Sequence, residues 1–92
     1  MNKGALGLAY RAKKIILGTD YVVEAMRHGE LSLILLASDA GENTKKKISD
    51  KAKTYQVEVN DRHSTEELSS AIGKQNVKVV GIKDKGFGEL LK

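Results

Sequence analysis

The chain has 92 residues, and its 16 Lys and Arg against 12 Asp and Glu give a formal charge of +4. This length accommodates one domain, so residues 1–92 are predicted to form a single unit. The absence of cysteine excludes disulfides and thiolate metal sites. The first residues, MNKGALGLAYRAKKI, are too polar for a signal sequence or a membrane span. We therefore expect a cytoplasmic protein with no membrane partner and a mild preference for polyanions.

The first predicted element is an amphipathic helix with a basic outer side. Its apolar face contains residues at helical spacing, namely Ala5, Leu8, Ala9, Ala12 and Ile16. The opposite face carries Lys3, Tyr10 and Lys14. A short extended piece, residues 15–17, then ends at Gly18. A second helix follows, with Thr19 or Asp20 as its cap and Gly29 as its end.

The middle of the chain is predicted to alternate between buried strands and helices. LSLILLAS, residues 31–38, is an almost continuous apolar run, as expected of a strand covered on both faces. A helix capped by Asn43 follows, and its buried stripe is formed by Ile48, Ala52 and Tyr55. A short alternating strand over residues 57–59 comes next.

The last third of the chain repeats this alternation. Ser64 and Glu67 have the spacing of a capping box, and the helix that they begin has an apolar stripe formed by Leu68, Ala71 and Ile72. After Gly73 comes a second interior strand over residues 77–82, and then a short helix with an apolar face formed by Phe87, Leu90 and Leu91. The alternation predicts an α/β fold, a three-layer α/β/α sandwich with a mixed four-stranded sheet.

Enzyme chemistry has little support in the sequence. His28 and His63 are expected on the solvated surface, because neither has the neighbours of a catalytic triad or a metal site. GFG at residues 86–88 lacks the spacing of a nucleotide-binding loop, and no P-loop is present. We therefore expect neither catalysis nor a cofactor nor a bound metal.

Two segments carry the chemistry of a binding site. Gly18, Thr19 and Asp20 form a strand-to-helix turn where backbone amides can meet an anion. The alternative is an ordinary capped helix start. Residues 72–79 form a loop whose amide and ammonium groups can reach bases and phosphates, and these belong to Lys74, Gln75, Asn76 and Lys78. Its alternative is a polar connection. In a sandwich of this kind, both segments can lie at one edge of the sheet.

The densest charge run, Lys45 to Lys47, has a different expected role. Consecutive helical residues point about 100° apart, so only part of the run can face one partner. We interpret it mainly as a solvated face.

The order of these segments resembles that of the kink-turn RNA-binding ribosomal proteins, the L-seven-Ae / L-thirty-e family. The resemblance extends from about Leu6 to Leu91 and is carried by AKKIILGTDYVVEAMRHGELSLILLASDA and LSSAIGKQNVKVVGIKD. Within the family, GLAYRAKKIILG followed by NTKKKISDKA is most similar to the bacterial YlxQ-type members.

The resemblance implies a role for each candidate residue. In that family the start of the second helix contacts tandem sheared G·A pairs, which assigns Gly18, Thr19 and Asp20 to those pairs and Lys14 to the adjacent phosphates. The loop after the fourth helix clasps a flipped-out base in the family. By the resemblance, the residues of this loop are Gly73, Lys74, Gln75 and Asn76.

Two positions depart from the family pattern, in which Asn and Glu begin the helix and Lys follows. Asp20 stands in place of Asn, and it can accept a hydrogen bond from guanine but cannot donate one. Glu24 reverses the charge of the usual Lys.

Two functions follow as hypotheses. The first is a monomeric protein that binds structured RNA, with ribosomal RNA as a candidate, at a kink-turn or a similarly bent loop. The second is a protein-interaction module of the same fold with weak or no RNA binding.

Overall fold

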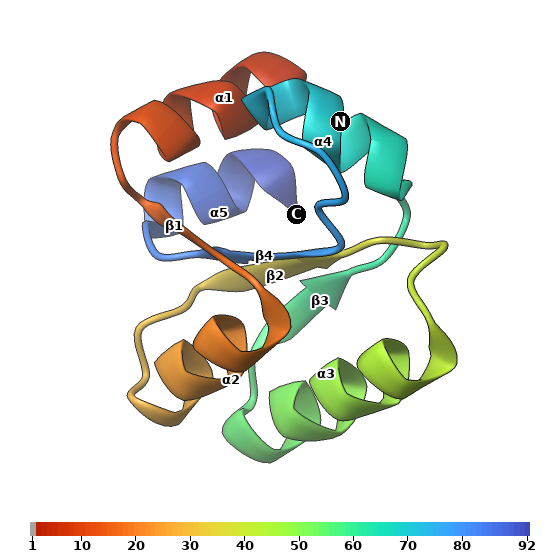
Figure 1. Ribbon diagram of the computed structural model, residues 1–92. Coiled ribbons are helices and arrows are strands. Elements are labelled where there is room, and N and C mark those ends of the chain that lie inside the picture. Colours follow the sequence, from red (N-terminus) through yellow and green to blue (C-terminus); the bar gives the residue numbers. More distant parts are fainter. Residues whose placement is uncertain (1) are drawn as a thin grey trace.

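The computed structural model describes residues 2–92, which form five helices and one four-stranded sheet (Figure 1). The helices are α1 (Lys3–Arg11), α2 (Thr19–Arg27), α3 (Glu42–Tyr55), α4 (Thr65–Ile72) and α5 (Lys85–Leu91). The strands are β1 (Ile15–Leu17), β2 (Leu33–Leu36), β3 (Glu58–Asn60) and β4 (Val79–Ile82). No helix in this part of the chain is long and apolar enough to span a membrane.

The sheet has the strand order β1-β4-β2-β3, and it is mixed as predicted. β4 is antiparallel to both of its neighbours, whereas β2 and β3 are parallel. Every residue of β2 and β4 is buried, because these two strands are central and covered on both faces. The apolar runs in the sequence therefore identified the two inner strands.

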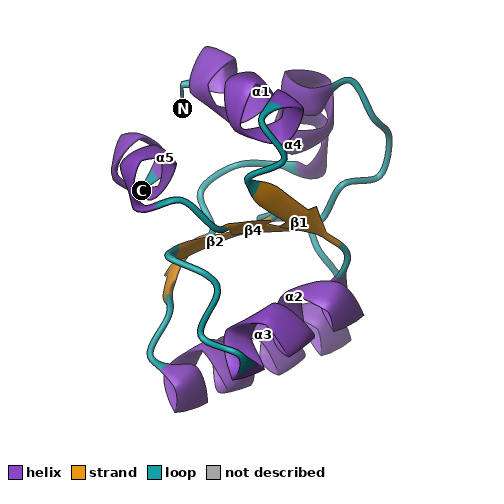
Figure 2. Ribbon diagram, turned by 90° about the vertical axis from the view of Figure 1, so that its left-hand side faces the viewer, coloured by secondary structure: helices purple, strands orange, loops and turns teal. Residues whose placement is uncertain are grey.

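The helices form one layer on each face of the sheet, as Figure 2 shows. α1, α4 and α5 cover one face, and α2 and α3 cover the other. The largest fully buried side chains come from both layers and from the sheet, and they are Leu6, Val22, Met26, Leu33, Ile34, Leu35, Ile48, Leu68, Val80 and Ile82. This confirms the predicted α/β/α sandwich.

Capping signals predicted some helix ends and missed others. The Ser64–Glu67 capping box is present, and Gly73 ends α4 in the left-handed conformation. The predicted caps at Thr19 or Asp20 and at Asn43 are wrong. Glycines stand at both of those helix starts, Gly18 before α2 and Gly41 before α3, and neither start has a side-chain cap.

Several predicted apolar faces also need correction. Leu8 is 53% exposed and Leu90 is 60% exposed. The buried side of α1 is centred on Leu6 and Ala9, because this helix packs against α4 and α5 as well as the core. The predicted face also continued past the end of α1 at Arg11, so Ala12 and Ile16 do not belong to this helix.

Candidate nucleic-acid interface

The start of α2 and the loop before β4 lie side by side at one edge of the sheet. Antiparallel pairing of β1 with β4 sets Leu17 opposite Val80, so the end of β1 meets the beginning of β4. The Gly18 amide donates to the Val79 carbonyl at 3.3 Å. The two segments singled out in the sequence are thus adjacent, although about 55 residues separate them.

The start of α2 presents unoccupied backbone donors. Gly18 has φ 98° and ψ 141°, a conformation that only glycine adopts readily. Within residues 2–92 no side chain caps the first amides of this helix. These donors and the positive end of the helix dipole can therefore bind an anion or a base edge.

Asp20 lies at the same helix start and is paired with a lysine from the neighbouring helix. The Lys47 Nζ is 3.0 Å from the Asp20 Oδ1, and the Asp20 side chain is 88% exposed. α2 and α3 pack against each other, which brings the last member of the Lys45–Lys47 run to this site. Sequence reasoning missed Lys47, because only the packing of the two helices shows which lysine of the run reaches the site.

The loop over residues 73–78 is held in shape by one buried side chain. The Ser69 carbonyl accepts a hydrogen bond from the Lys74 amide at 3.0 Å, and the Ser69 hydroxyl accepts one from the Val77 amide at 2.9 Å. Gly73 and Asn76 both have positive φ, 73° and 58°. The loop is therefore ordered before any ligand arrives, and Ser69 is a positioning residue that the sequence analysis missed.

Replacing Ser69 with Ala tests this anchoring. The change leaves the buried Val77 amide without its acceptor, so we expect the free energy of unfolding to fall by about 1 kcal/mol. Amide hydrogen exchange is expected to speed up at residues 74–77 more than in α3. Unchanged exchange in the loop would contradict a role for the Ser69 hydroxyl in its order.

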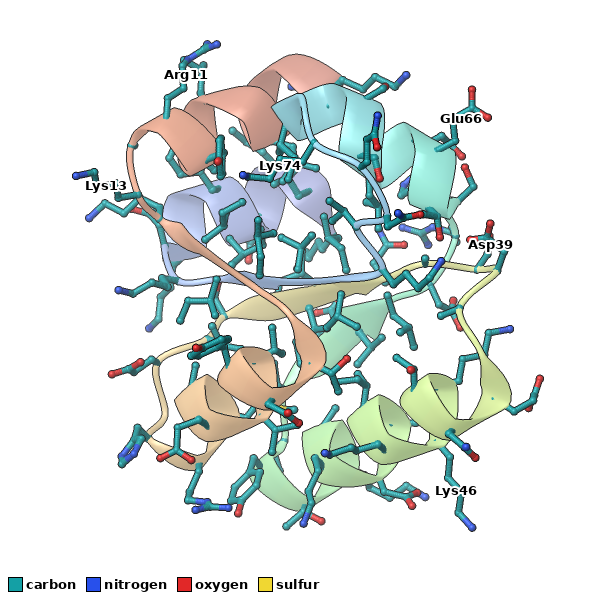
Figure 3. All side chains as sticks on the ribbon, in the orientation of Figure 1. Arg11, Lys13, Asp39, Lys46, Glu66 and Lys74 are labelled. Atoms are coloured by element: carbon teal, nitrogen blue, oxygen red, sulfur yellow. The ribbon has the colours of Figure 1, made fainter. Side chains whose placement is uncertain are left out.

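Polar side chains line an open hollow of about 580 Å³ between α4 and this loop. Lys78 donates to the Thr65 hydroxyl at 3.2 Å, and the Thr65 hydroxyl and amide donate to Asp39 at 2.7 and 2.8 Å. These two hydrogen bonds from Thr65 hold the pKa of the Asp39 carboxyl below its usual range. Asp39 lies on the same side of the molecule as Glu66, which also lines the hollow (Figure 3).

The remaining loop residues border the same hollow. Gln75 and Asn76 are exposed along it, and Lys74 lines it with its Nζ 5.6 Å from the centre of the Tyr10 ring. Tyr10, predicted on the outer face of its helix, is half-buried and packs against the core. The hollow thus offers amide, hydroxyl and ammonium groups around a space large enough for a planar ring.

Lys14 does not lie with the other candidates. It precedes β1, and its carbonyl accepts the Lys83 amide at 2.8 Å, at the opposite end of the strand from Gly18. The structure therefore places the Gly18 turn against Val79, directly after the loop over residues 73–78, and leaves Lys14 about one strand length away.

The two histidines are both beside glutamates. The exposed His28 Nε2 is 2.9 Å from Glu24, whereas the His63 Nδ1 is 3.4 Å from Glu67 and its side chain is only 16% exposed. The prediction of a solvated surface therefore holds for His28 but not for His63, which is half-buried. The described residues contain no group of three metal-ligating side chains.

The sequence model of the ribosomal protein L7Ae/L30e/S12e/Gadd45 family matches residues 2–92. The chain belongs to this family. Among curated proteins of similar sequence is the RNA-binding protein YlxQ of Bacillus subtilis, which is 41% identical over 94% of this chain and 86% of its own length. The RNA-binding protein YlxQ of Enterococcus faecium is 40% identical over 95% of this chain and 84% of its own. These findings confirm the family resemblance.

Solved structures show the L7Ae-type fold at two levels of sequence similarity. A protein of unknown function from Bacillus halodurans has a TM-score of 0.92 and 43% identity, over 97% of this chain and 90% of that one. The Giardia lamblia 15.5kD RNA binding protein has a TM-score of 0.79 at 15% identity, over 97% of this chain and 77% of that one. At that identity the likeness concerns the fold alone.

Proposed function

We propose that the chain binds structured RNA at a kink-turn or a similarly bent internal loop, and that it has no catalytic activity. The observation that carries this proposal is the hydrogen bond from the Gly18 amide to the Val79 carbonyl, which places the start of α2 beside the beginning of β4, directly after the polar loop. Membership in the L7Ae/L30e/S12e/Gadd45 family supports it, as do two relatives named as RNA-binding proteins.

In this proposal, the start of α2 contacts paired bases that the bend exposes. The free amides after Gly18 donate to acceptor atoms of the RNA, and Asp20 accepts from a guanine amino group. Gly18 lets the RNA approach the backbone closely. Lys47, which neutralises Asp20 in the free protein, is near enough to exchange that partner for a phosphate.

The hollow beside α4 receives an unpaired base. Single-stranded bases are read by hydrogen bonds to their edges and by stacking. Gln75, Asn76 and Lys78 supply donors and acceptors from the loop, and Gly73 allows the loop to turn back over the base. Lys74, at the rim of the hollow, supplies a cation to the backbone.

Three finer parts of the hypothesis remain predictions. They are that the physiological target is ribosomal RNA, that the protein is a monomer, and that it works in the cytoplasm. The candidate site needs no metal and no cofactor for this kind of binding, because backbone amides and side chains provide the contacts.

A protein-interaction module of the same fold is the second candidate function. The observation that favours it is the pairing of the Glu24 carboxylate with two basic side chains, Arg27 at 3.5 Å and His28 at 2.9 Å. These contacts reduce the positive charge on the exposed face of α2 that RNA would meet. The ordered loop and the hollow favour RNA, so we retain RNA binding as the conclusion.

A titration with three RNAs tests the proposed function. They are a kink-turn, the same RNA with Watson–Crick pairs in place of its G·A pairs, and a straight duplex of equal length. We expect the kink-turn to bind at least tenfold more tightly, with a log-affinity against log-salt slope of about three to five in magnitude. Equal affinities for all three RNAs, or a slope near zero, would contradict the proposal.

A further inference from the structure

Three exposed lysines gather at the end of β1 that lies away from Gly18, and we call them the lysine cluster. Lys13 and Lys14 lead into β1, and Lys83 follows β4 directly across from Lys14. The Lys83 amide donates to the Lys14 carbonyl at 2.8 Å, which extends the β1–β4 ladder by one pair. Figure 3 shows Lys13 projecting from the body of the molecule, on the opposite side from Lys46.

The backbone at Lys13 is in a conformation that favours glycine. Lys13 has φ 60°, and its amide donates to the Tyr10 carbonyl at 3.0 Å while the Lys14 amide donates to the Ala9 carbonyl at 2.8 Å. This is the Schellman arrangement that ends a helix, in which the left-handed residue is usually glycine. α2 ends in the same arrangement with Gly29 in that position. The lysine thus occupies a position where a glycine would relieve strain.

The three lysines of the cluster carry like charges, which repel each other. Side chains directly opposite in an antiparallel pair share one face of the sheet, and like charges there are destabilising. Among residues 2–92, no acidic side chain forms an ion pair with any of the three lysines. The nearest acid in sequence, Asp84, uses its carboxylate to accept the Phe87 amide at 3.1 Å. Residues that destabilise the fold and have no ion-pair partner within it are typical of functional positions.

We propose that the lysine cluster binds the phosphate backbone of a duplex that flanks the bent RNA loop. This inference rests on the proposed function and adds a second contact to it. Lys14 lies four positions before Gly18 in the sequence, which corresponds to about 13 Å along an extended strand. A stem that continues from the bend for a few base pairs covers that distance. Lys14 therefore works with Lys13 and Lys83, and the three lysines contribute affinity without reading sequence.

The test compares two RNAs that contain the same bent loop, one with short flanking stems and one with both stems lengthened. The parent protein is expected to bind the long-stem RNA about fivefold more tightly, because additional phosphates reach the cluster. Lys13→Gly and Lys83→Gln are each expected to reduce that advantage about two- to threefold and to leave short-stem binding unchanged. Lys46→Gln, an exposed lysine on the other side, is the matched control and keeps the full advantage.

Lys13→Gly carries its own check on folding. Relief of the left-handed strain is expected to raise Tm by about 3 to 6 °C, so weaker binding by this variant cannot come from unfolding. If the parent binds both RNAs equally, or if the long-stem advantage survives in Lys13→Gly and Lys83→Gln, the inference is wrong and the proposed function stands. If the parent binds neither RNA, the proposed function fails and the inference fails with it.

Discussion

Gly18→Val is expected to remove tight RNA binding and to destabilise the domain. A valine at φ 98° and ψ 141° is strained by about 3 kcal/mol, so the backbone must rotate toward negative φ. The nearest atom to an added Cβ, Tyr21 Cδ2, is 3.6 Å away, so the cost comes from the backbone conformation and not from lack of space. Rotation turns the first amides of α2 away from the ligand, and affinity for a kink-turn is expected to fall more than about twentyfold.

A matched pair of alanine variants separates folding from binding at Gly18. Gly29 also has positive φ, 68°, with no atom within 4 Å of an added Cβ, and it lies at the other end of α2. Gly18→Ala and Gly29→Ala are each expected to lower the free energy of unfolding by about 1 kcal/mol. Only Gly18→Ala is expected to weaken RNA binding in the titration. Equal affinity of these two variants would show that RNA does not depend on the start of α2.

Glu24→Lys is expected to tighten kink-turn binding by about 1 to 2 kcal/mol at moderate salt. Glu24 lies one turn beyond Asp20 on the exposed side of α2, and its carboxylate is paired with the side chains of Arg27 and His28. The change removes a negative charge, adds a positive one and releases both partners toward the phosphates. The gain is expected to shrink as salt rises, and it is measured by titration at several salt concentrations.

Glu24→Gln shows how much of this gain comes from the released partners. Its side chain is neutral, so we expect an affinity between those of the parent and Glu24→Lys. In an Arg27→Gln background the benefit of Glu24→Gln is expected to decrease, because the freed guanidinium is absent. Identical affinities of the parent, Glu24→Gln and Glu24→Lys would mean that this face of α2 does not meet RNA.

Much of the fold could be predicted because its strongest signals are local. The apolar runs over 31–38 and 77–82 contain the two central strands, and the Ser64–Glu67 pair marked the start of α4. Strand ends were predicted too wide, because apolar residues that flank β2, such as Leu31 and Ala37, belong to the core although they lie outside the strand itself. Leu8 and Leu90 were predicted on buried helix faces but are exposed. Helical spacing shows that a helix has an apolar face, whereas the part of that face that is buried depends on where the neighbouring helices lie.

The candidate site, too, could be predicted from the sequence only in part. Glycines and polar loop residues revealed both binding segments in the sequence, and the β1–β4 pairing joins them. The contributions of Lys47 and Ser69 depend on contacts between elements, which no local pattern contains. The separation of Lys14 from Gly18 follows from the length of β1, because an extended chain carries the two residues to opposite ends of the sheet.

Backbone amide NMR shifts, followed during titration with a kink-turn RNA, show which residues of the protein meet the RNA. We expect the largest changes to fall on residues 18–21 and 73–78 together, with smaller ones at Lys47, and we expect the exposed side of α5 to change little. Changes in only one of the two segments, or changes centred on α5, would contradict a single RNA surface built from the start of α2 and the loop before β4.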